Sequence, residues 1–201
     1  MTEALPFSQA CENNKHPILD VLQRHLLHTQ SLLEIGGGTG QHAVFFAAQF
    51  PQLKWQSSEY PPAVDTLNLR LCQSSLANLP AAIAIDANAA TWNCAVVDAI
   101  YSANCLHIVS TTAVEKFFAG VGRNLPVGGL LLVYGPFKYR GEFTTDSNAQ
   151  FDLWLKSRNP LSGVRDFEWV NELAENIGLV LLEDNSMPAN NQMLVWRKTA
   201  L

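Results

Sequence analysis

The chain has 201 residues, and 13 lysines and arginines against 18 aspartates and glutamates give it a formal net charge of −5. With 48% hydrophobic and 15% charged residues, it has the composition of a packed globular protein and not of a disordered one. The negative charge disfavours nucleic-acid binding, the longest apolar run (about 129–137) is too short to cross a bilayer, and the first residues show no signal-peptide pattern. We therefore expect a single domain over residues 1–201, located in the cytoplasm, with neither a nucleic-acid nor a membrane partner.

Segments with strand-like and helix-like patterns alternate along the chain. Pro17 is expected to open a helix within a helical N-terminal segment of about residues 8–29. Strands are predicted at 31–35, 53–58, 82–85, 96–103 and 130–134. Helices are predicted at 41–49, 63–78, 111–125, 151–157 and 167–177. The last two apolar segments, 179–183 and 193–197, are close enough in the chain to form an antiparallel pair.

Short apolar strands that alternate with helices are typical of a buried, mostly parallel sheet with helices on both faces. Ligands of such α/β sheets bind outside the carboxyl ends of the strands. The residues that directly follow each predicted strand are therefore the candidates for function.

The first predicted strand runs into a glycine-rich turn at 36–40 that leads into a helix. Glycines permit positive φ and leave no Cβ between the backbone and a ligand. A P-loop is excluded because no lysine follows Gly40, and a GxGxxG dinucleotide fingerprint fits poorly because Gln41 takes the place of its third glycine. The spacing GxGxG after an acidic residue resembles motif I of the class I S-adenosylmethionine (SAM)-dependent methyltransferases. A tight turn without a ligand is the alternative. The resemblance implies these cofactor-binding residues: Glu34, Gly36, Gly37, Gly38 and Gly40.

Three further strand ends agree with this resemblance. Glu59 ends the second strand, where a carboxylate can accept hydrogen bonds from ribose hydroxyls. Asp86 and Ala87 follow the third strand, at the place that contacts adenine in the methyltransferases. The segment 97–107 resembles motif IV of these enzymes, which implies that Asn104 lies near the sulfonium of the cofactor. A surface glutamate at 59 and an ordinary turn at 86 are the alternatives.

A closer resemblance covers almost the whole chain. Segments 14–19, 33–43, 55–59, 104–108, 134–137, 147–152, 165–166 and 187–191 resemble those of the domain-of-unknown-function 938 family, which is similar to methyltransferase-like protein 26. The resemblance implies a Rossmann-like class I methyltransferase sandwich with a seven-stranded sheet of order 3-2-1-4-5-7-6. It also implies that Asn14 contacts the cofactor. Asn13 stands where the family is expected to have arginine, so Lys15 or a backbone amide would have to replace that side chain.

Methyl transfer from SAM is an SN2 displacement, in which the protein mainly orients the acceptor and excludes water. A general base is needed only when the acceptor is a hydroxyl or a protonated amine. His107 follows the fourth strand and is the candidate base, because the ordinary pKa of histidine, about 6.5, suits proton abstraction. A histidine that packs beneath the next helix is the alternative.

Four residues are predicted to contact substrate: Tyr134, Phe137, Asn190 and Asn191. An interior tyrosine with a satisfied hydroxyl is equally compatible with the pattern at Tyr134, and the two asparagines could instead support a turn through local hydrogen bonds. The N-terminal segment (about 8–29) and the segment of about 137–166 are predicted to cover the substrate. The histidines show no metal-ligand spacing, so no metal is predicted.

The sequence thus predicts a SAM-dependent methyltransferase that acts on a small molecule and releases S-adenosylhomocysteine. A non-catalytic SAM-binding or interaction module is the first alternative, and a nicotinamide-dependent reductase is the second.

Overall fold

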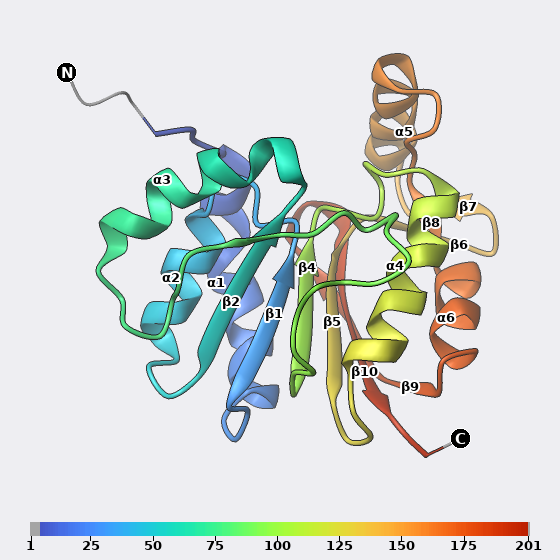
Figure 1. The fold of residues 1–201 in the computed structure, drawn as a ribbon. Coiled ribbons are helices and arrows are strands. Elements are labelled where there is room, and N and C mark those ends of the chain that lie inside the picture. Colours follow the sequence, from blue (N-terminus) through green and yellow to red (C-terminus); the bar gives the residue numbers. More distant parts are fainter. Residues whose placement is uncertain (1–4, 201) are drawn as a thin grey trace.

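A seven-stranded sheet forms the centre of the computed structural model, which describes residues 5–200 (Figure 1). Its strands, in chain order, are β1 (Ser31–Ile35), β2 (Lys54–Glu59), β3 (Ile83–Ala84), β4 (Ala99–Ala103), β5 (Leu130–Gly135), β9 (Leu179–Met187) and β10 (Asn191–Lys198). The spatial order is β3-β2-β1-β4-β5-β10-β9, and β10 runs antiparallel to both of its neighbours. Counted along the chain, this is the predicted order 3-2-1-4-5-7-6, which is therefore confirmed.

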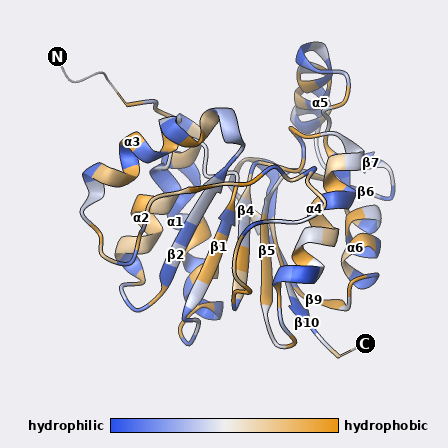
Figure 2. Ribbon diagram, in the orientation of Figure 1, coloured by the Kyte–Doolittle hydropathy of each residue, from blue (hydrophilic) through white to orange (hydrophobic). Residues whose placement is uncertain are grey.

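Helices cover both faces of the sheet, as the strand–helix alternation predicts (Figure 1). The helices α1 (Gln9–His25), α2 (Gln41–Gln49) and α3 (Val64–Ser74) pack on one face. The helices α4 (Thr111–Asn124) and α6 (Phe167–Glu175) pack on the other. Hydrophobic residues colour the central strands in Figure 2 because both faces are buried.

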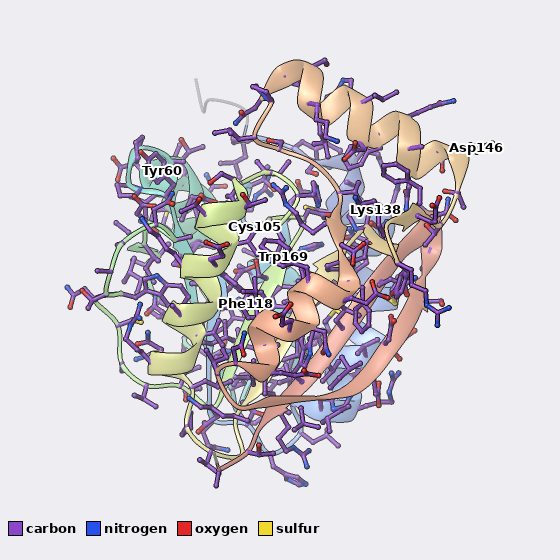
Figure 3. The ribbon with its side chains drawn as sticks, turned by 90° about the vertical axis from the view of Figure 1, so that its right-hand side faces the viewer. Tyr60, Cys105, Phe118, Lys138, Asp146 and Trp169 are labelled. Carbon is purple, nitrogen blue, oxygen red and sulfur yellow. The ribbon has the colours of Figure 1, made fainter. Side chains whose placement is uncertain are left out.

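Two separate hydrophobic cores result from the alternation of side chains along each strand. Leu32 of β1 points to the core beneath α1, α2 and α3, whereas the next residue, Leu33, points to the core beneath α4 and α6. Phe118 on α4 and Trp169 on α6 mark the helices that close this second core (Figure 3). Because side chains alternate, successive residues of one continuously apolar strand contribute to the two cores in turn.

The prediction that Pro17 opens the first helix is wrong. Helix α1 begins at Gln9, and Pro17 lies inside it. Ser8 caps the helix, since its hydroxyl accepts a hydrogen bond from the Cys11 amide (3.3 Å). A proline removes one intrahelical hydrogen bond, but Ile18 and Leu22 on the following turns are fully buried against the sheet. Packing of this apolar face offsets the lost bond.

The segment after β5 contains structure that the sequence pattern does not predict. The strands β6 (Phe137–Tyr139), β7 (Glu142–Phe143) and β8 (Arg165–Asp166) form a second, three-stranded sheet of order β7-β6-β8. Strands of two or three residues are too short to show a period of two. Helix α5 (Asp146–Arg158) projects from the body in Figure 1 and begins five residues before the predicted start. Thr145 sets that start, because its hydroxyl accepts a hydrogen bond from the Asn148 amide (3.3 Å).

The antiparallel terminal pair is confirmed, and both of its strands are longer than predicted. A single 3-10 turn, η2 (Pro188–Asn190), joins β9 to β10. A second 3-10 turn, η1 (Pro61–Ala63), leads into α3. Among the described residues, no helix is both long and apolar enough to span a membrane.

Candidate functional site

The predicted cofactor-binding residues at four strand ends gather at the carboxyl edge of the parallel strands. The glycine-rich loop follows β1, Glu59 ends β2, Asp86 follows β3, and Asn104 follows β4. Backbone hydrogen bonds join neighbouring ends: the Gly36 and Gly37 amides donate to the Ser58 carbonyl (3.1 and 2.9 Å). Residues that are up to 70 positions apart in the chain therefore share one edge of the sheet, as parallel topology requires.

The glycines of the loop have two different roles. Gly36, Gly38 and Gly40 have positive φ (77°, 55° and 76°), which glycine adopts without strain. A Cβ on Gly37 would lie 2.4 Å from the hydroxyl oxygen of Ser57, whereas a Cβ on Gly38 would meet no atom within 4 Å. Gly37 is therefore required for packing within the protein, and Gly38 presents bare backbone to open space. That open space fits a ligand that approaches the loop closely.

Glu34 lies beneath this loop, and its carboxylate is buried. It accepts hydrogen bonds from the indole nitrogen of Trp55 (3.0 Å) and from the hydroxyl of Ser57 (2.7 Å). Burial raises the pKa of Glu34, and these two hydrogen bonds oppose the rise. The carboxylate therefore binds Trp55 and Ser57 of β2 beneath the glycine-rich loop.

The ends of β2 and β3 carry carboxylates at the edge itself. Glu59 accepts hydrogen bonds from the amides of Gly38 (2.7 Å) and Tyr60 (2.8 Å), so its carboxylate is fixed beside the open glycine. Asp86 accepts a hydrogen bond from the Asn88 amide (2.8 Å), which closes a tight turn after β3, and Ala87 lies within that turn. Both carboxylates are only partly buried.

Helix α1 contributes a buried polar group to the same edge. The amide oxygen of Asn14 lies 2.7 Å from Nε2 of His42, and Nδ1 of His42 lies 3.4 Å from the Tyr101 hydroxyl. Burial lowers the pKa of His42 to about 4, so the ring is neutral at neutral pH. A hydrogen bond with Asn14 partly offsets the burial that raises the pKa of the Tyr134 hydroxyl. Asn14 thus connects α1 to His42 of α2, through it to Tyr101 in the middle of β4, and to Tyr134 near the end of β5.

The residues on either side of Asn14 in α1, Asn13 and Lys15, face away from the buried Asn14–His42 contact. Asn13 is exposed and accepts a hydrogen bond from the side chain of Gln9 (2.9 Å). Lys15 pairs with Glu12 and lies over the ring of Phe45. The amide of Asn14 is therefore the polar group that this turn of α1 presents to the interior.

Asn104 and His107 lie in the loop between β4 and α4. Asn104 has a positive φ of 55°, and its backbone amide donates to the Tyr134 carbonyl (2.8 Å). His107 is buried, at 5% exposure, and its ring packs edge-on against Phe151 of α5 (centroids 5.4 Å apart). Burial, assisted by the positive charge of Arg165, lowers the pKa of His107 to about 4. The imidazole is therefore neutral at neutral pH, and the surroundings that keep it neutral also make it a weaker base than an ordinary histidine.

Arg165 holds this loop in place, a role that no sequence motif predicts. Its guanidinium donates to the carbonyls of Leu106 (3.0 Å) and Leu161 (2.9 Å) and also to that of Val109. The Gly163 amide donates to the His107 carbonyl (2.9 Å). The segment after α5 therefore fixes the backbone on both sides of His107. No local pattern could reveal this, because the contact joins residues 59 positions apart.

The four predicted substrate residues lie in different environments. Tyr134 is buried on the α1 face, and Phe137 is 1% exposed in the core beneath α4 and α6. Asn191 donates to the carbonyls of Pro188 and Ala189 (3.2 and 3.1 Å), which is the turn-supporting alternative. Asn190 has a positive φ and donates to the Ser147 hydroxyl (3.1 Å). Of the four, Tyr134 is the one in contact with other residues of the carboxyl edge.

Two residues that the sequence analysis did not select tie the N-terminal segment to the glycine-rich loop. The side-chain oxygen of Gln41 accepts hydrogen bonds from the Ser8 amide (2.6 Å) and the Thr39 hydroxyl (3.0 Å). Arg70 of α3 donates to the carbonyls of Thr39 (2.6 Å) and Pro6. The only sequence signal was Gln41 itself, which stands where a dinucleotide fingerprint has its third glycine.

Solved methyltransferases share this fold at low sequence identity. The human N-acetylserotonin methyltransferase in complex with SAM matches 96% of this chain with a TM-score of 0.82 and 16% identity. An O-methyltransferase family protein from Burkholderia thailandensis matches 92% with a TM-score of 0.80 and 16% identity. An O-methyltransferase family 2 protein from Planctomyces limnophilus in complex with apigenin matches 94% with a TM-score of 0.79 and 19% identity. The chain spans about half of these proteins (53%, 56% and 58%).

A family model is matched over nearly the whole chain. The model describes a protein of unknown function, DUF938, and it matches residues 5–198. The match includes the glycine-rich loop, the loop of Asn104 and His107, and the segment of Arg165. The chain therefore belongs to the DUF938 family and has the α/β fold of the class I SAM-dependent methyltransferases.

Proposed function

We propose that the protein binds SAM and transfers its methyl group to a small-molecule acceptor. The observation that carries the proposal is the open backbone of Gly38, fixed by Glu59 at the end of β2 and following β1, which lies between β2 and β4 in the sheet. Glu59 would bind the ribose, Asp86 and Ala87 would lie at the adenine, and Asn104 and Asn14 would lie at the sulfonium and amino-acid end. When bound, SAM supplies a methyl group on a positively charged sulfur.

The protein's own part in the reaction follows from the chemistry of methyl transfer. Holding the acceptor in line with the methyl group contributes roughly 7–11 kcal/mol in well-oriented pairs. Burial of the loop around His107 excludes water, and the neutral imidazole would accept the proton of a hydroxyl acceptor. Tyr134, the N-terminal segment and residues 137–166 would position and cover the acceptor.

The supporting comparisons favour a hydroxyl acceptor. Two of the three proteins named above are described as O-methyltransferases, and one of these was solved with apigenin, a small aromatic molecule. Burial and Arg165 keep the loop histidine unprotonated at neutral pH, as a general base must be, but its pKa of about 4 makes it a weaker base than an ordinary histidine.

Cofactor binding is tested by calorimetric titration of SAM and S-adenosylhomocysteine. The wild type should bind both, and Gly38→Ala should bind at least tenfold more weakly, because its Cβ enters the space next to Glu59. Gly128→Ala is the matched control, since Gly128 also has positive φ (88°) with open space around its Cβ position but lies in the turn before β5. The proposal fails if neither compound binds or if Gly38→Ala binds like the wild type.

Turnover is tested with labelled SAM and a panel of small hydroxylated compounds, including phenols. We expect a methylated product whose formation is slowed about 10²-fold or more in His107→Asn, with the SAM affinity unchanged. SAM binding without any labelled product would favour the non-catalytic binding module. A change in NADH fluorescence on mixing, without SAM binding, would favour the reductase.

A further inference from the structure

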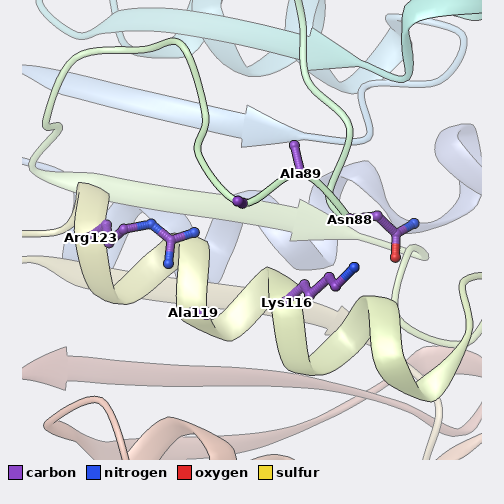
Figure 4. Close-up of a pocket in the computed structure, with 6 residues that line it drawn as sticks. Asn88, Ala89, Lys116, Ala119 and Arg123 are labelled. Carbon is purple, nitrogen blue, oxygen red and sulfur yellow. The ribbon is translucent and has the colours of Figure 1, made fainter.

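A cavity lies away from the carboxyl-edge residues described above. It has a volume of about 240 Å³ and lies between α4 and the segment that follows β3 (Figure 4). Its lining consists of Asn88, Ala89, Ala90, Lys116, Ala119 and Arg123. The glycine-rich loop, Glu59 and Asn104 are not among these residues. Asn88 follows the Asp86–Ala87 pair, so the cavity adjoins the proposed cofactor site without being part of it.

The charge of this cavity is positive, although the chain as a whole carries a net charge of −5. Lys116 and Arg123 are its only ionisable lining residues. Within residues 5–200, neither of them belongs to an ion pair. The nearby carboxylate of Asp86 already accepts the hydrogen bond of the Asn88 amide. Two cations are therefore available to a ligand.

The spacing of these cations along α4 suits a ligand with two anionic ends. Lys116 and Arg123 are seven residues apart, which is two helical turns or roughly 10 Å along the axis. Ala119 lies between them on the same side of the helix, and Figure 4 shows this side facing Ala89 and Asn88. Because only methyl groups lie between the two cations, the middle of the cavity remains open.

The wall opposite α4 is held by a close packing contact. A Cβ on Gly120 would lie 2.3 Å from the ring of Trp92, so the indole packs directly on the helix backbone next to Ala119. Trp92 is 6% exposed, and its indole nitrogen has no hydrogen-bond acceptor within the described part of the chain. The contact fixes the segment that carries Asn88, Ala89 and Ala90, which preserves the cavity in the absence of a ligand.

We propose that this cavity binds a small ligand with two linked anionic groups, of the class of inorganic pyrophosphate and other diphosphates. The Arg123 guanidinium offers a planar fork to one group, and the Lys116 ammonium offers a point charge to the other. The side-chain amide of Asn88, which lines the cavity, is available to the oxygen between them. The volume lies below the usual range of about 300–1,000 Å³ for drug-sized ligands, so the ligand is small.

The test is a titration of pyrophosphate, with SAM absent, followed by calorimetry and by ³¹P NMR. We expect saturable binding of one pyrophosphate per chain, at least tenfold weaker in the variant Lys116→Gln/Arg123→Gln. Ala119→Leu should also weaken binding, because it fills the cavity without changing the charge. The matched control is Lys54→Gln/Arg197→Gln, which removes the same charge at two exposed positions and should bind like the wild type.

Three results would overturn this proposal. The first is a wild type that binds no pyrophosphate at about 10 mM, a generous upper limit for the Kd of a specific anion site. The second is a Lys116→Gln/Arg123→Gln variant that binds as well as the wild type. The third is a Lys54→Gln/Arg197→Gln control that loses as much binding as the Lys116→Gln/Arg123→Gln variant. Parallel titrations with orthophosphate and succinate distinguish a diphosphate site, which should prefer pyrophosphate, from one that accepts any anion or any pair of carboxylates. Because SAM takes no part, the outcome is independent of the proposed methyl transfer.

Discussion

The two halves of the carboxyl edge are assembled in different ways. The glycine-loop half comprises the ends of β1, β2 and β3, and the contact at its centre joins two residues of the predicted motif: Gly38 donates to Glu59, 21 residues away. The insertion half comprises the ends of β4 and β5, and its loop is held by Arg165, 59 residues from the Leu106 carbonyl that it binds. The glycines and Glu59 leave a recognisable spacing in the sequence because the residue types themselves are required, whereas the carbonyls that Arg165 binds could belong to any residue and leave no motif.

Each half buries one neutral histidine, and this gives the largest predicted effect. The pKa values of His42 and His107 are lowered to about 4, so between pH 6.5 and 4 the unfolded chain binds more protons than the folded one. The free energy of unfolding should therefore fall as the pH drops through this range, by on the order of 5 kcal/mol at pH 4.5 for the two together.

Urea unfolding at pH 7 and pH 4.5 measures this loss. His42→Gln and His107→Gln should each remove about half of the pH dependence if both halves exclude water equally. If one of these variants lost as much stability between pH 7 and pH 4.5 as the wild type, the histidine replaced in it would be open to solvent, and so would its half of the edge.

Substitutions at two adjacent glycines, Gly37 and Gly38, test the roles assigned to them in the glycine-loop half. Gly37→Ala should lower the free energy of unfolding by about 3 kcal/mol, because its Cβ would displace the Ser57 hydroxyl from the buried Glu34 carboxylate. Gly38→Ala should cost about 1 kcal/mol, since its Cβ meets open space and only the positive φ is strained. Urea unfolding compares them, with Gly128→Ala as the control for strain alone. Equal costs at 37 and 38 would contradict the two roles assigned to these glycines.

Arg165 provides the corresponding test of the insertion half. Arg165→Gln and Arg165→Lys should each cost about 2 kcal/mol, because both lose the fork that binds the carbonyls of Leu106 and Leu161. The pKa of His107 should rise in Arg165→Gln and stay low in Arg165→Lys, since only the first removes the positive charge. Proton NMR titration of the imidazole measures this difference. An unchanged pKa in Arg165→Gln would mean that burial alone keeps His107 neutral.

A surface pair outside both halves should have the smallest effect. Arg24 lies 2.8 Å from Glu183, and together with Asn185 and His25 it lowers the pKa of Glu183 to about 2. Arg24 is 48% exposed, so Arg24→Gln should cost less than about 1 kcal/mol, and salt should reduce that cost further. Thermal unfolding at low and high salt measures it. A cost above about 2 kcal/mol would mean that α1 depends on this pair for its docking.

The sequence by itself determined the alternation of strands and helices, the glycine-rich loop and the residues at four strand ends. These follow from local periodicity, and the topology of a parallel sheet then brings the strand ends together. The resemblance to a known family supplied the strand order, because periodicity contains no information about which strands are neighbours.

The tertiary structure decided the rest. Packing against the sheet stabilises α1 as a continuous helix through Pro17, and the cap at Thr145 makes α5 begin five residues before the predicted start. Only the fold brought Arg165 to the backbone around His107 and placed Lys116 and Arg123 opposite Asn88. Burial, which depends on all of these contacts at once, made His42 and His107 neutral. A pKa and a long-range hydrogen bond depend on the whole surroundings of a residue, and so neither can be predicted from its neighbours in the chain.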